Sequence, residues 1–286
     1  MSKPSKGLIF SLSTSFLWAV SIVNLRFLMN SGGNVINITF WINLVAAIFW
    51  IPFFVKHIRS YLKLSKKYKI LLVLIALTST FGINLLQSLA LKYSPAANFA
   101  FLYRTVVVFT IILAWMFFKE KITRSKVILT AFILVGSYLL IMKGQQFILT
   151  KGDIYTLLMA VCGAFVANIL IKHTVAKMHP DISASVISLL TVLTLFPVIF
   201  VSQSLSVPNN IILILFGGFI AFLQIATRNR AYKIVSASYI TMIVSLTPVF
   251  VTVMSFFLLG EKLEPIQIVG GLMIVSSGVL AEKLKI

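Results

Sequence analysis

Long apolar runs separated by short polar breaks occupy almost the whole chain. Each run is long enough to cross a hydrocarbon core, which takes about 20 helical residues. Backbone amides in lipid need partners within the protein, and the runs lack the alternation of barrel strands, so we expect helices. The pattern predicts ten transmembrane helices, at about 7–28, 34–55, 69–91, 95–118, 125–143, 152–171, 182–203, 210–227, 236–259 and 265–281.

Composition agrees with a membrane protein. Hydrophobic residues make up 59% of the 286 positions and charged residues 11%, and the mean hydropathy is +1.04. A water-soluble helical core does not fit, because the runs have no wide polar face. Lys3 and Lys6 precede the first run as in a signal peptide, but this run is long and lacks a clear cleavage site. We therefore interpret it as a retained helix.

The two halves of the chain are related in sequence. Glu120 and the lysine after it recur 141 positions later, at Glu261, and the apolar runs and their breaks coincide at this offset. We therefore divide the chain into two five-helix repeats, 1–147 and 148–286. Because five is odd, the second repeat must enter the membrane from the opposite side. The expected fold class is an all-α integral membrane protein of ten transmembrane helices in two inverted-topology repeats.

Basic residues are distributed unequally between the loops. The formal net charge is +19, which in a soluble protein would suggest nucleic-acid binding. With both termini on one side, 19 of the 25 Lys and Arg residues fall on that side, five fall on the other, and Arg104 lies within a helix. This positive-inside pattern predicts a cytoplasmic-membrane protein with both termini in the cytoplasm and no nucleic-acid partner. The basic loop at 56–69 either signals topology or also recruits anionic lipid.

The ends of the repeats carry a further pattern. Residues 256–280 read FFLLGEKLEPIQIVGGLMIVSSGVL, and residues 116–140 read the weaker copy MFFKEKITRSKVILTAFILVGSYLL. The first helix of each repeat begins with a glycine, Gly7 or Gly152. The signature positions in the second copy are Gly260, Glu261, Gln267, Gly270 and Gly271.

With these features the chain resembles EamA-type transporters of the drug/metabolite transporter superfamily, and the two repeats cover nearly its full length. Three positions depart from the pattern: Lys119 replaces the glycine in the first copy, Val107 stands opposite Pro248, and Gly163 stands opposite Trp18. The resemblance implies transport of a metabolite and leaves the solute open.

Inverted repeats allow two packings that expose a central site to opposite sides of the membrane in turn. We therefore expect a secondary transporter that moves a small organic metabolite across the cytoplasmic membrane by alternating access, by export or exchange. The expected solute is amino acid-like or otherwise anionic or zwitterionic. The alternative is a flippase for a lipid or lipid-linked headgroup. The expected partners are the solute and membrane lipid, with the chain as a monomer or homodimer.

Arg104 is the main candidate for binding the solute. It lies about nine residues below the outer end of its helix, or about 13 Å, which is close to the bilayer midplane. An arginine at this depth is costly and marks a functional site by default. No carboxylate partner for it is evident in the apolar runs, so we expect it to bind a carboxylate or phosphate of the solute. The alternative is an arginine that locks helix packing or snorkels outward.

Other polar residues occupy nearly symmetric positions in the two repeats. Together with Trp18, which lies in the middle of its helix, they are expected to line a central passage; hydrogen bonding between helices is the alternative. The pairs are Asn24 with Asn168, Asn84 with Gln224, Gln87 with Arg228, and Asn98 with Tyr239. Pro248 is expected to kink the ninth helix. Glu120 and Glu261 are expected to cap the helices that follow them.

The sequence offers little support for an enzyme. His57, His173 and His179 fall in predicted loops without metal-ligand spacing, and the chain has no GxxxxGK phosphate loop. We expect no membrane-embedded carboxylate for catalysis or proton exchange. The chain is therefore predicted to have no catalytic residues, no metal site and no cofactor.

Overall fold

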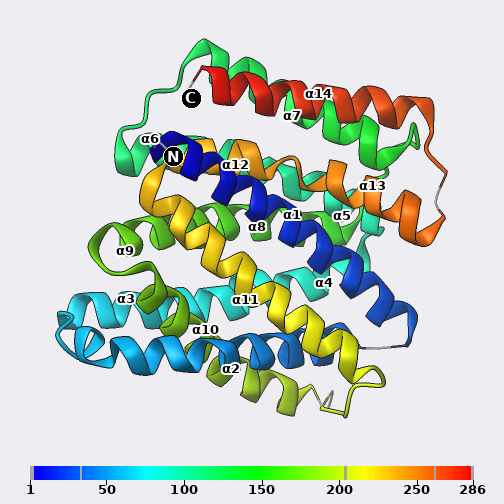
Figure 1. Ribbon diagram of the computed structural model, residues 1–286. Coiled ribbons are helices and arrows are strands. Elements are labelled where there is room, and N and C mark those ends of the chain that lie inside the picture. Colours follow the sequence, from blue (N-terminus) through cyan, green and yellow to red (C-terminus); the bar gives the residue numbers. More distant parts are fainter. Residues whose placement is uncertain (1–2, 33, 203–204, 261, 285–286) are drawn as a thin grey trace.

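The computed structural model describes residues 3–32, 34–202, 205–260 and 262–284 (Figure 1). Within these ranges it contains ten spans that are long and apolar enough to cross a membrane. The predicted all-α membrane fold is thereby confirmed. The helical elements are α1 (Lys3–Asn30), α2 (Val35–Leu62), α3 (Lys66–Thr78), η1 (Ser79–Leu85), α4 (Leu86–Tyr93), α5 (Ala96–Leu102), η2 (Tyr103–Thr105), α6 (Val106–Phe118), α7 (Arg124–Met142), α8 (Lys151–Cys162), η3 (Gly163–Leu170), α9 (Ile171–Lys177), α10 (Pro180–Val201), α11 (Ile211–Ile234), α12 (Ala237–Val244), α13 (Thr247–Leu259) and α14 (Pro265–Lys283).

Helix packing follows the two-repeat organisation. The first span packs on the eighth through α1 and α11, and the third packs on the sixth through α4 and α8, which is the same pairing with the repeats exchanged. A Cβ built on Gly7 would lie 2.4 Å from Val235 Cγ1, and one built on Gly152 would lie 2.5 Å from the Ser94 amide nitrogen. The glycine at the start of each repeat therefore allows the same close crossing in both halves.

The two repeats run in opposite directions through the bundle, as an odd number of spans requires (Figure 1). Figure 1 places the N- and C-terminal helix ends at one end of the bundle. We call this the terminal end; it includes the loops at 63–65, 119–123, 178–179 and 235–236. The opposite, distal end includes the loop between α7 and α8.

The fourth span of each repeat ends in a residue with left-handed backbone conformation, although the residue type differs between the repeats. Gly260 ends α13 with φ 65°, and Lys119 ends α6 with φ 55°. Both values are left-handed, which costs a non-glycine residue about 1–2 kcal/mol. The fold therefore imposes this turn on Lys119 as well.

The third and sixth spans each contain a π-helical segment, η1 and η3 respectively, and these two segments contact each other. A Cβ built on Gly82 in η1 would lie 3.2 Å from Cys162 Sγ, at the start of η3. The symmetry-related first and eighth spans are the uninterrupted α-helices α1 and α11. π-helical turns are rare and frequently lie at functional sites.

Helices α7 and α14, the last of each repeat, cross with almost no space between their backbones. A Cβ built on Gly270 would lie 2.5 Å from the Gly136 carbonyl oxygen and 2.6 Å from the Leu140 nitrogen. One built on the next residue, Gly271, would meet only Leu140 Cδ1, at 3.8 Å. Gly270, unlike Gly271, is thus required by the helix crossing.

We expect Gly270→Ala to lower the free energy of unfolding by about 1–3 kcal/mol, because the added methyl group must push two backbones apart. Gly271→Ala, its matched control, is expected to leave stability unchanged or slightly raised. Thermal unfolding of the purified protein in detergent measures both. Equal melting temperatures for the two variants would contradict the close crossing.

Candidate functional site

The fourth and ninth spans are both interrupted at the same point of the repeat. In the fourth, the short 3₁₀ turn η2 separates α5 from α6 and contains Arg104. In the ninth, the break between α12 and α13 contains Ser245, 141 positions after Arg104. The break expected from Pro248 is confirmed, since α13 begins immediately before this proline. The first repeat breaks without a proline, so the interruption belongs to the fold.

Arg104 lies inside the bundle against two aromatic rings. The residue is only 6% exposed, and its Cζ lies 5.6 Å from the centre of the Trp18 ring and 5.9 Å from that of Tyr103. These rings meet edge to face, with centroids 5.9 Å apart. Ring faces attract a cation and position it without neutralising it. Trp18 and Arg104, both predicted for the site, are thus brought together.

A second arginine lies near the same tyrosine. Arg228 is within electrostatic reach of Tyr103 and Tyr232. The apolar run ends at about residue 227, which places Arg228 among the loop cations, but helix α11 continues to Ile234 and keeps this arginine inside the eighth span. That assignment was wrong, because hydropathy falls a full two turns before the helix ends.

In the part of the chain that the structure describes, neither arginine has a neutralising partner. The buried Nε atoms of Arg104 and Arg228 have no hydrogen-bond partner. Among the described residues, no carboxylate lies within 4.0 Å of either guanidinium. A buried cation without a counter-ion is costly, and its unsatisfied N–H groups are suited to oxygen atoms of an anion.

A chain of hydrogen bonds borders this region and joins three spans. Asn168, in the π-helical segment η3, donates from Nδ2 to Thr110 Oγ1 at 2.6 Å. Its Oδ1 accepts from the Tyr232 hydroxyl, also at 2.6 Å. Tyr232 lies one turn after Arg228 on α11, so the chain links the sixth span to both the fourth and the eighth. Both ends of the Asn168 amide are therefore hydrogen-bonded, and its partner Tyr232 is the tyrosine that also acts on Arg228.

Tyr103 was not among the residues predicted for the site, although it lies against Trp18 and Arg104. It is 8% exposed, and its ring stacks on Phe99 with centroids 6.1 Å apart. A Cβ built on Gly163 would lie 3.1 Å from the Tyr103 hydroxyl oxygen. The glycine opposite Trp18 in the repeat thus leaves room for this phenol. An aromatic residue within an apolar run carries no signal of its own; only its position next to Arg104 could have marked it.

The remaining predicted residues lie in different surroundings. Asn24 is buried and donates to the Leu213 carbonyl of α11 at 3.1 Å, while its own Oδ1 has no partner. Gln87 and Gln224 are half-buried, and their side chains form no hydrogen bond with the described part of the chain. Tyr239 donates its hydroxyl to the Glu282 carboxylate. Lining of a passage by these side chains stays a prediction.

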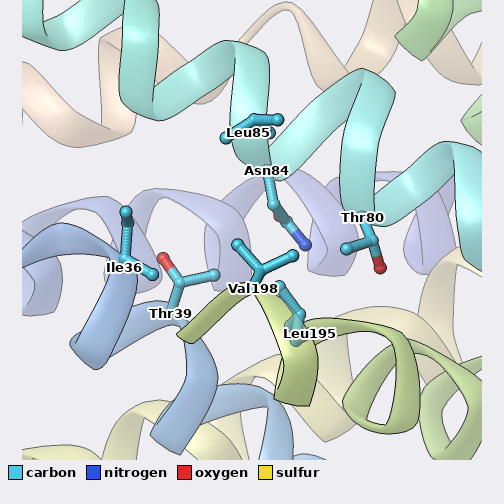
Figure 2. Close-up of a pocket in the computed structure, with 7 residues that line it drawn as sticks. All are labelled: Ile36, Thr39, Thr80, Asn84, Leu85, Leu195 and Val198. Atoms are coloured by element: carbon cyan, nitrogen blue, oxygen red, sulfur yellow. The ribbon is translucent and has the colours of Figure 1, made fainter. Parts of the chain in front are cut away.

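Asn84 borders a small pocket between η1, α2 and α10 (Figure 2). The free volume is about 10 Å³, which is enough for about one water molecule. Figure 2 shows the Asn84 amide pointing into it, between Thr39 and Thr80. The other lining residues are Ile36, Leu85, Leu195 and Val198. This pocket does not include Arg104, and it is too small for an organic solute.

A carboxylate joins the two repeats at the terminal end of the bundle. Glu120 accepts hydrogen bonds from the Ala237 amide at 3.0 Å, the Ser238 amide at 3.4 Å and Ser238 Oγ at 2.5 Å. We expected Glu120 to cap the following helix, which was wrong: Thr123 caps α7, and Glu120 caps α12 in the other repeat. It therefore ties the two repeats together. Its counterpart Glu261 lies outside the described residues.

A second carboxylate lies at the distal end. Asp153 is 1% exposed; it accepts from Ser94 Oγ at 2.6 Å, from the Thr150 amide at 2.7 Å and from Asn98 Nδ2 at 3.4 Å. The expectation of no carboxylate within the apolar segments was therefore wrong. Asp153 is the third residue of the capping box that begins at Thr150, the N-cap of α8, and its carboxylate is satisfied by backbone and side-chain donors. It joins the second repeat to the end of α4 in the first.

Comparisons with known proteins agree with this architecture. The model of the EamA-like transporter family matches residues 5–142 and 150–281. The chain is 25% identical over 223 residues to the uncharacterized transporter YyaM of Bacillus subtilis (strain 168). This match covers 73% of this chain and 72% of YyaM. It is also 25% identical over 299 residues to an uncharacterized transporter of Clostridium kluyveri, covering 96% and 92% of the two chains.

A solved crystal structure with 14% sequence identity superimposes with a TM-score of 0.78 and covers 97% of this chain and 98% of the other. This likeness shows the fold alone. The family match covers both five-helix repeats, including the signature residues near the end of each. From the two-repeat fold and this match, the protein is a multi-pass membrane protein of the EamA-like transporter family.

Proposed function

We propose that this transporter carries small organic anions or zwitterions, and that Arg104 and Arg228 bind a carboxylate or phosphate of the solute. The observation that supports this most strongly is the pair of embedded guanidinium groups whose Nε atoms lack a partner. An arginine in the membrane interior costs at least about 2.5–3.5 kcal/mol. An anion that bridges the two groups offsets this cost with charge-assisted hydrogen bonds.

The aromatic residues determine which part of the solute fits next to the anion. Trp18 and Tyr103 flank Arg104, and Phe99 stacks on Tyr103. Their faces provide an apolar surface beside the charged group. This combination supports a solute with a carboxylate or phosphate at one end and a carbon skeleton at the other, in preference to inorganic phosphate.

The two carboxylate contacts support alternating access. Glu120 holds the terminal end closed by binding α12, and Asp153 holds the distal end closed by binding Ser94 of the first repeat. Each contact joins the two repeats, so each must break for its end to open. Opening of one end at a time would expose the arginines to the two sides in turn.

The proposed orientation places the terminal end in the cytoplasm. Moving Arg228 from the loops into the eighth span leaves 18 of the original 19 cations on the terminal side, against five on the distal side. Loops rich in Lys and Arg stay on the cytoplasmic side of the membrane, so this excess assigns the terminal end to the cytoplasm.

We expect exchange to be faster than net transport, because an empty carrier must reorient with both arginines uncompensated. Purified protein in liposomes is loaded with one unlabelled anion, and uptake of radiolabelled amino acids, dicarboxylates, phosphate esters and a neutral sugar is followed. Anion uptake should require an anion on the opposite side. Uptake of the sugar alone would contradict the proposal. Movement of labelled lipid without any solute uptake would instead favour a flippase.

A further inference from the structure

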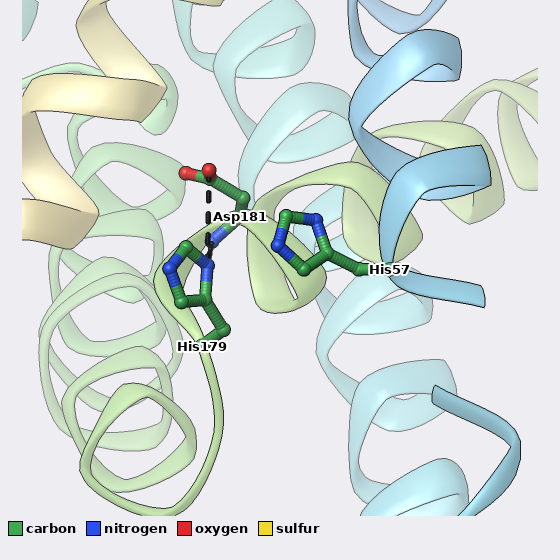
Figure 3. Close-up of side chains that lie close together, drawn as sticks. All are labelled: His57, His179 and Asp181. Atoms are coloured by element: carbon green, nitrogen blue, oxygen red, sulfur yellow. Dashed lines mark hydrogen bonds and ion pairs between the residues drawn. The ribbon is translucent and has the colours of Figure 1, made fainter. Parts of the chain in front are cut away.

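A cluster of potential metal ligands lies at the terminal end, away from the two arginines. His57 comes from α2 in the first repeat, and His179 and Asp181 come from the start of α10 in the second. One ligand atom from each residue can be chosen so that all three lie within 4.8 Å of one another. Figure 3 shows the three side chains directed toward a common region.

The hydrogen bonding of His57 leaves one nitrogen free for a metal. Its Nδ1 lies 2.9 Å from the Phe53 carbonyl oxygen. A carbonyl oxygen only accepts, so Nδ1 carries the proton and Nε2 of the neutral ring has the lone pair. In Figure 3 this Nε2 edge faces His179 and Asp181. A backbone carbonyl that fixes the tautomer in this way is the usual support of a metal-binding histidine.

The Asp181 carboxylate is held with one oxygen on the histidine side. Arg230 binds Oδ1 at 3.2 Å, while Oδ2 lies 3.7 Å from His179 Nδ1. The Asp181 side chain is 9% exposed. Its Oδ2 is therefore oriented toward the cluster by a neighbour that occupies the other oxygen. The Arg230 guanidinium also repels a nearby cation. An ion at this site must therefore be held by the histidine nitrogens as well as by the Asp181 carboxylate.

His179 has the freedom to complete the site. Its side chain is 53% exposed, and its ring stacks on His57 with centroids 4.7 Å apart and planes 17° apart. Partial burial lowers the pKa of His179, although Asp181 opposes this shift. The His179 Nδ1 accepts only a long hydrogen bond, 3.3 Å from the Asp181 amide.

We propose that His57, His179 and Asp181 bind a divalent transition-metal ion of the Zn²⁺ type, with water completing the coordination. Two imidazoles and one carboxylate match the ligand preference of Zn²⁺ better than that of Mg²⁺ or Ca²⁺. Bonds of about 2.0–2.1 Å in a tetrahedral site need ligand atoms about 3.3 Å apart. The exposed His179 must turn out of its stack with His57 to reach this spacing.

The site would connect the two repeats. α2 and α10 pack along each other, and the ion would join them next to the loop that precedes α10. A bound ion would resist any relative movement of the repeats at the terminal end. The inference is independent of the arginine site, because neither the two arginines nor the solute contributes a metal ligand.

Zinc binding is measured on full-length protein purified in detergent with a histidine-free tag and stripped of metal. Competition with a chromophoric zinc indicator should give about one Zn²⁺ per chain. His57→Ala and His179→Ala are expected to weaken binding at least about tenfold. His173→Ala is the matched control: His173 stacks on Tyr68 and lies outside the cluster, so this variant should bind as the parent does.

Two further measurements separate metal binding from folding. Saturating Zn²⁺ should raise the melting temperature of the parent and the His173→Ala protein, but not of His57→Ala or His179→Ala. Co²⁺ bound to the parent should give visible ligand-field absorption without a thiolate charge-transfer band, and Zn²⁺ should abolish it. Equal binding by all four proteins, a thiolate band from Cys162, or no binding by the parent would each overturn the proposal.

Discussion

Replacing Arg104 by glutamine is expected to weaken binding of the transported anion about 100-fold. Hydrogen bonds to a charged group contribute about 1.5–3 kcal/mol, and 1.4 kcal/mol corresponds to a tenfold change in affinity. Glutamine keeps an amide donor but removes the charge, and Arg228 alone cannot surround the anion. Equilibrium binding of the best anion from the exchange screen, measured on detergent-purified protein, gives the affinity directly.

The stability of the unliganded Arg104→Gln protein distinguishes solute binding from helix locking. Arg104 is 6% exposed, and its Nε has no hydrogen-bond partner. Removing a buried, uncompensated charge relieves a desolvation cost, so the melting temperature should be unchanged or higher. If the arginine served to lock helix packing, the melting temperature would fall.

The controls for Arg104 follow from charge and position. Arg59→Gln removes the same charge from an exposed site on α2, and it should leave anion binding unchanged. Arg104→Lys should recover part of the affinity, because lysine keeps the charge but loses the planar fork. An equal loss of anion and neutral-solute binding in Arg104→Gln would remove the proposed role in anion recognition.

Replacing Glu120 by alanine is expected to open the terminal end. The carboxylate satisfies two amides and the hydroxyl at the start of α12, and charge-assisted bonds of this kind contribute about 1.5–3 kcal/mol. Without them, the closed arrangement should lose roughly 10- to 100-fold in population relative to an arrangement open at this end. The amides of Ala237 and Ser238 should then exchange with deuterium much faster.

Hydrogen exchange followed by mass spectrometry of the 232–245 segment tests this effect. Lys121→Ala is the matched control, because Lys121 lies in the same loop but its side chain is exposed. It should exchange as the parent does. Unchanged exchange in Glu120→Ala would mean that the contact does not hold the terminal end closed. A uniform rise across all ten spans would indicate global destabilisation instead.

The spans and repeats were predictable because they rest on properties that extend over many residues. Twenty apolar residues in a row have few alternatives to a membrane helix, and an odd number of spans per repeat fixes the inversion. The helix ends were not predictable in the same way. Helix α11 continues through Thr227, Arg228 and Asn229 to Ile234, because helix formation does not require an apolar residue at each position.

The site was predicted only in part for a related reason. Arg104 and Trp18 stood out because each is unusual in the middle of an apolar run. Their meeting at Tyr103, and the pairing of Asn98 with Asp153 across 55 positions, depend on the packing of distant spans. His57 was assigned to a loop, but it lies on α2 and faces residues of α10. No local spacing in the sequence encodes these contacts.

The π-helical segments occur in only one of the two symmetry-related helix pairs. The third span, which ends just before Ser94, and the sixth span, which carries Asp153, contain η1 and η3. In contrast, α1 and α11 are regular throughout. A π turn interrupts the i→i−4 ladder and makes a helix easier to bend at that point. The bundle is therefore symmetric in topology but unequal in stiffness. Under the proposed alternating access, we expect the distal and terminal openings to have different activation barriers, so that the solute leaves one face of the membrane faster than the other.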